Sequence, residues 1–264
     1  MTDRLPCNHH HHPAQGYNFC FMGFQRYLYI IVCFLMTQMV NADSAVFIEG
    51  VSDGCGTNAE YVMHACTIES GSEPASEGQI PPEMANLGAN GFLNLGRLWQ
   101  KIDRCLIRFD MASLADRMVS IEQARLVLTV YNFNGNSMDQ PLPDNIPLRL
   151  YRIDAANAGW VEGDSVIGER VEGAVCWAYR VTGQQPWAGE HGCGQAGVDR
   201  EANPLAEVTL NHDELIRGQE VVFEFTDLDF LEDWVQDETV NTGFLIESPL
   251  LETTLSDRDI GLVL

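Results

Sequence analysis

A tryptophan in a polar, glycine-rich stretch is the residue whose type and setting most directly suggest binding chemistry. Trp187 lies in the run TGQQPWAGEHGCG, residues 182–194. The apolar face of a pyranose ring packs well on an indole, so an exposed Trp187 would be a ligand-binding residue for carbohydrate. The alternative is a tryptophan folded over the edge of a β-structure to shield it. Trp160, Trp177 and Trp234 are expected in the core.

Cysteines and one histidine allow either cross-linking or metal binding. Five cysteines follow residue 42. The disulfide candidates are the two pairs close in sequence, Cys55 with Cys66 and Cys176 with Cys193. In an oxidising compartment each pair would close a short loop, worth about 3 kcal/mol. Cys105 is then expected to be a buried, unpaired thiol. His191 with Cys176 and Cys193 could bind Zn²⁺, but after export a disulfide is the better interpretation.

Carboxylates gather in the segment 227–238 and could hold Ca²⁺, which takes six to eight oxygen ligands. They are Asp227, Asp229, Glu232, Asp233, Asp237 and Glu238. No D-x-[DN]-x-[DN]-G pattern is present, and the solvated face of a helix is the preferred alternative. We therefore predict no cofactor, keep Ca²⁺ as an open alternative, and assign no metal ligands.

Motifs that would define a catalytic site do not occur. The sequence contains no G-x-S-x-G, no H-E-x-x-H and no glycine-rich phosphate loop. A glycosidase needs two carboxylates at a set separation, but 38 acidic residues make such a pair uninformative here. We assign no catalytic residue and predict that the chain is not an enzyme.

The charge excludes several partners. The formal net charge of the 264 residues is -23, which disfavours nucleic acid and anionic membrane surfaces. Apolar residues make up 45%, enough for a sizeable core. A soluble extracellular protein is consistent with both numbers.

The N-terminus resembles a secretory signal. Residues 27–40, YLYIIVCFLMTQMV, follow Arg26 and precede Asn41 and Ala42, which gives a basic flank, an apolar stretch and a small-residue cleavage site. We predict a signal region over 1–42, with Met22 as the possible true start. The main rival is an uncleaved anchor, although the run is short for a membrane span. The protein is expected to be secreted or at the cell surface.

The rest of the chain reads as short strands separated by Gly, Asn, Asp and Pro. The expected strands cover 44–50, 60–68, 92–99, 105–114, 124–133, 146–153, 206–210, 220–225, 242–248 and 259–264. One short helix is expected near 227–237, capped by Thr226 or Asp227. We predict an all-β fold, an antiparallel β-sandwich, as a single domain over 43–264.

The order of several runs is similar to that of a known family. CLIRFDMASL, ARLVLTVYNF, LRLYRI, AGWVEGD, GAVCWAY, EVVFEFTDLDFLEDW and TGFLIES follow one another over about 90–248. This resembles the DNRLRE-type β-sandwich domain of secreted bacterial proteins, including those of planctomycetes, which is related to carbohydrate-binding modules. The resemblance implies a jelly-roll-like sandwich, export, and polysaccharide binding or a role in cell-surface architecture. The run DIGLVL stands where the family's closing strand is expected, so that strand is either replaced or missing.

From these features we expect a secreted, non-catalytic β-sandwich module that binds polysaccharide or another cell-envelope component. The alternative is a structural or adhesive cell-surface protein without sugar specificity. A polysaccharide-degrading enzyme is the third and least favoured hypothesis.

Overall fold

The computed structural model describes residues 32–33, 44–45, 48–49, 62–71, 80–89, 92–98, 101–115, 120–135, 144–165, 168–253 and 260–264. Most of the predicted signal region, with the possible start at Met22, lies outside these ranges. Its one described piece, strand β1 (Val32–Cys33), pairs with β2 (Ser44–Ala45). Within the described ranges, none of the helices combines the length and apolar character that crossing a bilayer requires.

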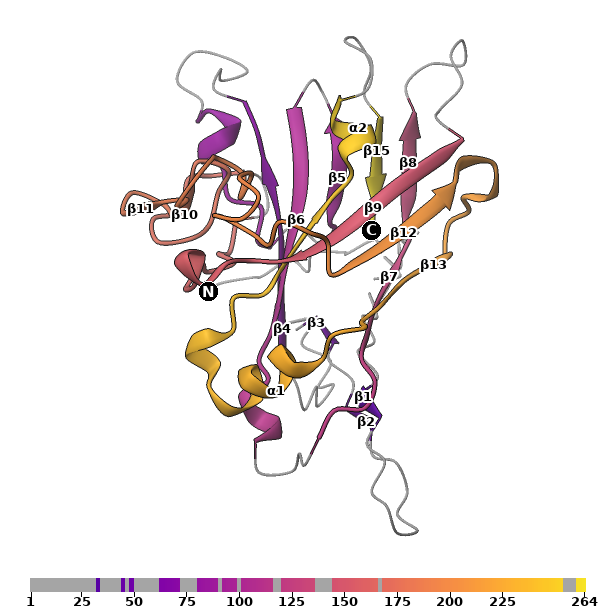
Figure 1. The fold of residues 1–264 in the computed structure, drawn as a ribbon. Coiled ribbons are helices and arrows are strands. Elements are labelled where there is room, and N and C mark those ends of the chain that lie inside the picture. The colour runs from indigo at the N-terminus through magenta and orange to yellow at the C-terminus, as the bar shows by residue number, and fades with distance from the viewer. Residues whose placement is uncertain are drawn as a thin grey trace, which may run out of the picture.

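Strands dominate the structure, and a sheet of nine strands forms its centre (Figure 1). These strands are β3 (Ile48–Glu49), β4 (Val62–Glu69), β5 (Asn94–Leu98), β6 (Lys101–Phe109), β8 (Asn132–Gly135), β9 (Asn145–Arg152), β12 (Ala206–Asn211), β14 (Phe244–Glu247) and β15 (Ile260–Val263). The order runs β12-β9-β14-β6-β5-β15-β8, and β4 pairs with β6 and with β3. Pairing between described strands of this sheet is antiparallel except between β3 and β4. The predicted all-β class is confirmed.

A second sheet of two strands, β7 (Arg125–Thr129) and β13 (Glu220–Glu224), shares the main core with one face of the large sheet. Burial alternates along β13 because successive side chains point to opposite sides, whereas three successive residues of β7 are buried. Leu126 and Phe223 of the small sheet are fully buried in the same cluster as Ile107 and Ile246 of the large sheet. This shared core fixes the small sheet against the large one.

Phe244 of β14 lies at the centre of an aromatic cluster in this core. Its ring centroid is 5.1 Å from that of Trp234, 5.4 Å from Phe225, 6.0 Å from Phe230 and 6.3 Å from Phe109. The angles between these rings are tilted or edge-to-face, the arrangements that aromatic pairs prefer. The cluster joins the large sheet to the helix that carries Phe230 and Trp234.

That helix is α1 (Asp229–Gln236), and it confirms the predicted helix near 227–237. Asp227 accepts a hydrogen bond from the Asp229 amide at 3.2 Å and so satisfies one amide at the helix start. The buried side chains of α1 recur on one face at helical spacing, whereas its acidic residues face away from the core, apart from the half-buried Glu232.

A second short helix, α2 (Pro249–Thr253), was not predicted. It directly follows β14, and its five residues are too few for a periodic pattern in the sequence. Proline at its first position suits a helix start, because the missing amide would have no partner there. The 3₁₀ turns are η1 (Pro82–Met84), η2 (Ala112–Leu114), η3 (Ala155–Asn157), η4 (His212–Glu214) and η5 (Glu238–Val240).

The other face of the large sheet is covered by the segment 154–200, which includes the small hairpin β10 (Tyr179–Val181) and β11 (Gln185–Pro186). Leu106 and Leu245 of the sheet form a second core with Trp160 and Val175 of this segment. The Trp160 indole N–H donates to the Thr242 carbonyl at 2.8 Å, so its one polar atom is satisfied in the core. Figure 1 shows the segment beside β4 and β6.

Within the C-terminal run DIGLVL, β15 forms an inner strand of the large sheet. β15 pairs with β5 on one side and with β8 on the other. Leu262 is fully buried in the main core. β15 therefore has a partner strand along both of its edges.

Candidate ligand-binding face

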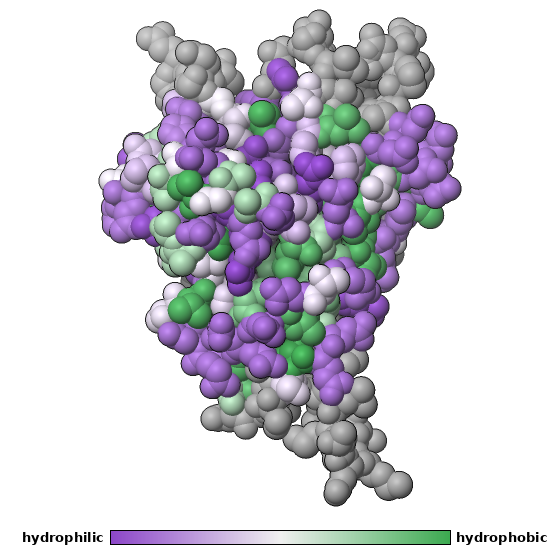
Figure 2. Space-filling view, in the orientation of Figure 1, coloured by the Kyte–Doolittle hydropathy of each residue, from purple (hydrophilic) through white to green (hydrophobic). Residues whose placement is uncertain are grey.

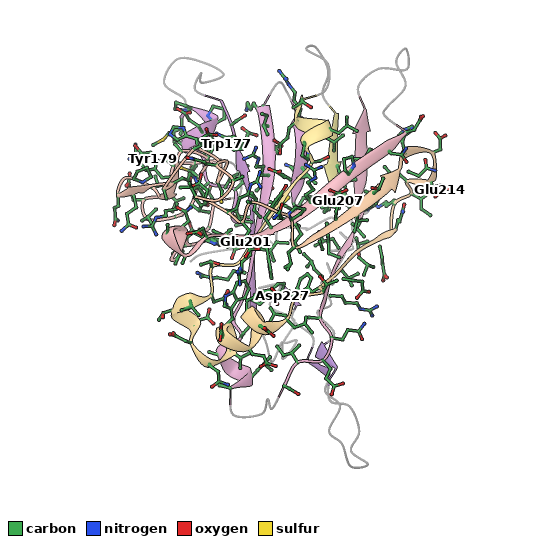
Figure 3. All side chains as sticks on the ribbon, viewed as in Figure 1. Trp177, Tyr179, Glu201, Glu207, Glu214 and Asp227 are labelled. Carbon is green, nitrogen blue, oxygen red and sulfur yellow. The ribbon has the colours of Figure 1, made fainter. Side chains whose placement is uncertain are left out.

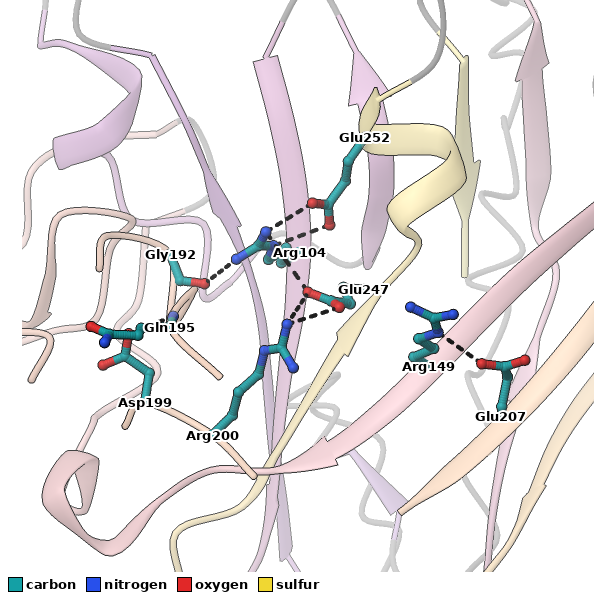
Figure 4. A network of polar contacts seen from close by, with 9 residues as sticks. All are labelled: Arg104, Arg149, Gly192, Gln195, Asp199, Arg200, Glu207, Glu247 and Glu252. Atoms are coloured by element: carbon teal, nitrogen blue, oxygen red, sulfur yellow. Dashed lines mark hydrogen bonds and ion pairs between the residues drawn. The ribbon is translucent and has the colours of Figure 1, made fainter. Parts of the chain in front are cut away.

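Cross-strand register brings four charged side chains into a row on the face that the segment 154–200 partly covers. Arg149 of β9 lies opposite Glu207 of β12 on one side and opposite Glu247 of β14 on the other. Arg104 of β6 continues the row, with its Nη2 3.7 Å from a Glu247 carboxylate oxygen. Positive and negative groups thus alternate across four neighbouring strands (Figure 4). We call these four residues the charged row.

At the buried end of the charged row, Arg104 is held at three points. Its Nε and Nη2 donate to the two carboxylate oxygens of Glu252 at 3.0 and 2.8 Å, and its Nη1 donates to the Gly192 carbonyl at 2.9 Å. Burial would lower the pKa of Arg104, but its hydrogen bonds and ion pair with Glu252 outweigh this, and the pKa lies above its ordinary value. Burial raises the pKa of Glu252, and Arg104 offsets this only in part.

Arg200 connects the segment 154–200 to the middle of the charged row. Its Nη2 donates to both carboxylate oxygens of Glu247, at 3.0 and 3.1 Å. The guanidinium lies over the Tyr151 ring, 3.8 Å from the ring centroid, an arrangement that adds cation–π attraction. Burial and the nearby Glu247 charge raise the pKa of Tyr151. Glu247 therefore has arginines from the sheet and from the covering segment on either side.

Asp199 organises the loop that carries Arg200 and Gly192. Its buried carboxylate accepts backbone hydrogen bonds from Gly189 and Glu190, both at 2.8 Å, and from Gln195 at 2.9 Å. Asn157 donates a further bond from its side chain at 2.9 Å. One carboxylate that gathers this many donors fixes the loop, and the loop positions the groups that meet the charged row.

The other end of the charged row is open to solvent. The Arg149 side chain is 37% exposed and the Glu207 side chain 44% exposed, and they form an ion pair of 2.7 Å. The hydrogen bond from Arg149 to Glu207 raises the pKa of Arg149. This pair offers donors and acceptors side by side on a rigid sheet, which suits hydroxyl-rich ligands. Figure 2 shows hydrophilic residues on this face together with hydrophobic ones near its centre.

The expectation that Trp187 is exposed is wrong. Its side chain is 4% exposed, and its indole N–H donates to the carbonyls of Cys176 at 3.2 Å and Trp177 at 2.9 Å. The ring belongs to the second core, where it packs with Trp160 and Cys193. Trp187 is therefore a buried residue of the core that the segment 154–200 forms with the large sheet.

Trp177, which was expected in the core, keeps part of its surface exposed. Among the described tryptophans it is the one that is not fully buried. The Arg104 guanidinium lies 5.1 Å from its ring centroid, so Trp177 adjoins the buried end of the charged row. Tyr179 lies nearby and is also half-buried (Figure 3). The apolar run GAVCWAY contains no signal that would distinguish Trp177 from a core residue.

Cys176 and Cys193 do not form the predicted disulfide in this structure. Both are buried free thiols. The Thr182 hydroxyl donates to the Cys176 sulfur at 3.3 Å, and the Cys193 thiol donates to the Asp199 carbonyl at 3.4 Å. Burial raises the pKa of both thiols. The other predicted pair is not described, because Cys55 lies outside the described residues, whereas Cys66 is buried in the second core.

The residues weighed as candidate zinc or calcium ligands do not converge on one point in the described part of the chain. In the described part of the chain, no group of three or more His, Cys, Asp or Glu side chains could hold a metal ion. His191 is exposed, whereas Cys193 is fully buried. Of the acidic residues at 227–238, Asp227 and Asp237 accept backbone hydrogen bonds at the starts of α1 and η5. Four are exposed, namely Asp227, Asp229, Asp233 and Asp237.

In comparisons with known proteins, no family model matches this chain and no curated protein sequence matches it. The similarity to the DNRLRE-type domain stays a prediction that rests on the order of sequence runs.

Proposed function

We propose that this chain is a secreted, non-catalytic β-domain that binds polysaccharide on the exposed end of the charged row. The proposal includes a jelly-roll-like β-sandwich fold, and the core that the two sheets share supports it. Export is supported by the apolar run at residues 27–40 and its flanks. The partner is a polysaccharide or another component of a cell envelope.

The observation that carries this proposal is the exposed Arg149–Glu207 pair at the end of a row that is otherwise buried. Hydrogen bonds across the sheet and the charges of the buried end hold the row's backbone in place. A ligand that binds there meets groups that are already ordered, so little conformational entropy is lost on binding. Guanidinium and carboxylate together can donate to and accept from neighbouring hydroxyl groups.

The net charge narrows the class of polysaccharide. At -23 the protein repels polyanions unless a cation bridges them. Glu207 of the exposed pair and Glu214 both lie on the face that Figure 3 shows. A neutral or amine-bearing polymer is therefore favoured over uronic-acid or sulfated polymers.

A binding screen of the full chain against neutral, amine-bearing and acidic polysaccharides tests the proposal, with calcium and with a chelator in separate arms. We expect saturable binding to a neutral or amine-bearing polymer. Arg149→Ala should weaken it about tenfold or more, because a hydrogen bond to a charged group contributes about 1.5–3 kcal/mol. Loss of binding with the chelator alone would instead support a calcium site.

The matched control is Arg170→Ala. Arg170 and Glu172 form another exposed pair, 2.7 Å apart with side chains 41% and 63% exposed, in the segment 154–200. Equal effects of Arg149→Ala and Arg170→Ala would show that binding depends on general charge and not on the row.

A structural or adhesive role without sugar specificity is the alternative, and one observation favours it. Arg104 and Glu247 are saturated by partners within the protein, which is typical of groups that stabilise a fold. If the folded protein binds none of the polysaccharides, the result favours the structural or adhesive role. The exposed Arg149–Glu207 pair would then be a surface ion pair without a ligand.

A further inference from the structure

Asp103 of β6 is a buried carboxyl group without a hydrogen-bond partner. The residue is 1% exposed, and neither of its carboxylate oxygens has a hydrogen-bond partner among the described residues. It precedes Cys105 and Ile107 on the side of β6 that faces the main core. Burying an ionised carboxylate in this way is costly, because no donor replaces the water it loses.

The strands on either side of Asp103 supply no free positive charge. Glu69 of β4 lies directly opposite, and from β5 the opposite residue is Gly96. Lys101, two residues away on β6, has its ammonium group 2.8 Å from a Glu69 carboxylate oxygen. Arg97 of β5 is paired with Ile102, and the charges that act on Asp103 are those of Glu69 and Lys101.

This environment favours the uncharged acid. Burial raises the pKa of Asp103 well above its usual range, the Glu69 carboxylate raises it further, and Lys101 lowers it only in part. We propose that Asp103 is kept protonated in the native domain, so that the junction of β4, β5 and β6 is a pH-sensitive element that loosens as the medium becomes alkaline.

The sign of the effect follows from proton linkage. An unfolded chain releases the Asp103 proton near the ordinary value of about 3.9, whereas the folded chain retains it to higher pH. Between these two values the folded state binds more protons than the unfolded state. The contribution of Asp103 to the free energy of unfolding is fully present below about pH 4. It is lost progressively as pH rises through the folded-state pKa, which lies well above the usual range.

Urea unfolding of the full chain at pH 5 and pH 8 tests the proposal. We expect the midpoint of the wild-type protein to fall from pH 5 to pH 8, and Asp103→Asn to reduce that fall. The amide keeps the shape of the acid but has no proton to lose. Asp164→Asn is the matched control, because that side chain is exposed and its substitution should leave the fall unchanged. A fall in Asp103→Asn equal to that of the wild type would overturn the proposal.

A second measurement does not depend on the variant folding. With ¹³C label at the side-chain carboxyls of aspartate in the wild-type protein, one aspartate resonance should stay in the protonated position at a pH where the others have ionised. Labelling aspartate alone keeps Glu252 and Glu238 out of the spectrum. If every aspartate resonance titrates in the ordinary range, Asp103 is ionised in the fold and the proposal is wrong.

Discussion

Arg104 of β6 and Glu252 of α2 form a two-point ion pair, with donor–acceptor distances of 3.0 and 2.8 Å, although the two residues are 148 positions apart in the chain. Both side chains are largely buried. The same guanidinium also donates to the Gly192 carbonyl and approaches Glu247. A single side chain thus connects the central strand, the last helix and the loop of the covering segment.

Arg104→Ala should therefore destabilise the protein strongly. Removing one partner of a buried pair leaves the other charge without compensation, which costs about 3–5 kcal/mol. Urea unfolding near neutral pH measures the loss. The double variant Arg104→Leu with Glu252→Leu should lose less free energy of unfolding than Arg104→Ala, because it leaves no unpaired charge at position 252. A loss below about 1 kcal/mol, the size found for surface pairs, would contradict the buried ion pair.

Trp187→Ala should reduce stability by about 3–5 kcal/mol, as expected for a large aromatic side chain removed from a core. Trp187→Phe is the control, since it keeps an aromatic ring and loses the indole N–H that bonds to the Cys176 and Trp177 carbonyls. Trp187→Phe should lower the free energy of unfolding by less than Trp187→Ala does. If Trp187→Ala unfolds like the wild type but binds polysaccharide more weakly, Trp187 is a ligand residue after all.

Two glycines allow a paired test of how Trp177 is packed. Gly192 and Gly197 both have positive φ, at +72° and +75°. A Cβ at Gly192 would lie 2.6 Å from the Trp177 ring, whereas at Gly197 it would have no atom within 4 Å. Gly197→Ala should lower the free energy of unfolding by about 1–2 kcal/mol through backbone strain alone. Gly192→Ala adds overpacking of about 1–3 kcal/mol. Equal urea midpoints for the two variants would contradict the close packing.

Cys176 and Cys193 should resist alkylation in the native protein and react after unfolding without reductant. Both thiols are buried, and their raised pKa leaves little thiolate to attack the reagent. Mass spectrometry of peptides after unfolding and alkylation distinguishes the possibilities. Two alkylated cysteines support the structure, and a peptide linked through both sulfurs would restore the predicted disulfide.

Much of the fold could be predicted because burial alternates along a strand. The run at 146–153 became β9, with Ile146, Leu148 and Leu150 all buried on one side. The helix near 227–237 was predicted from spacing that its buried face confirms. Such patterns are local, so they can be recognised in the sequence before any partner strand is known.

The candidate site could be predicted much less well. Trp187 was judged from its polar neighbours, but its ring turns inward onto carbonyls ten and eleven residues earlier. The charged row depends on the register of β6, β14, β9 and β12, strands separated by long stretches of chain. No local pattern contains that register.

The amino-acid sequence by itself determined the all-β class, strand segments such as 146–153 and 220–225, the helix α1, and the burial of Trp160 and Trp234, since these depend on periodicity and composition within short windows. Tertiary structure alone decided which charges face each other, that Trp177 is the tryptophan with exposed surface, and that Asp103 lies buried without a partner. These properties depend on the distance between segments far apart in the chain, and that distance is set only when the sheets pack around a common core.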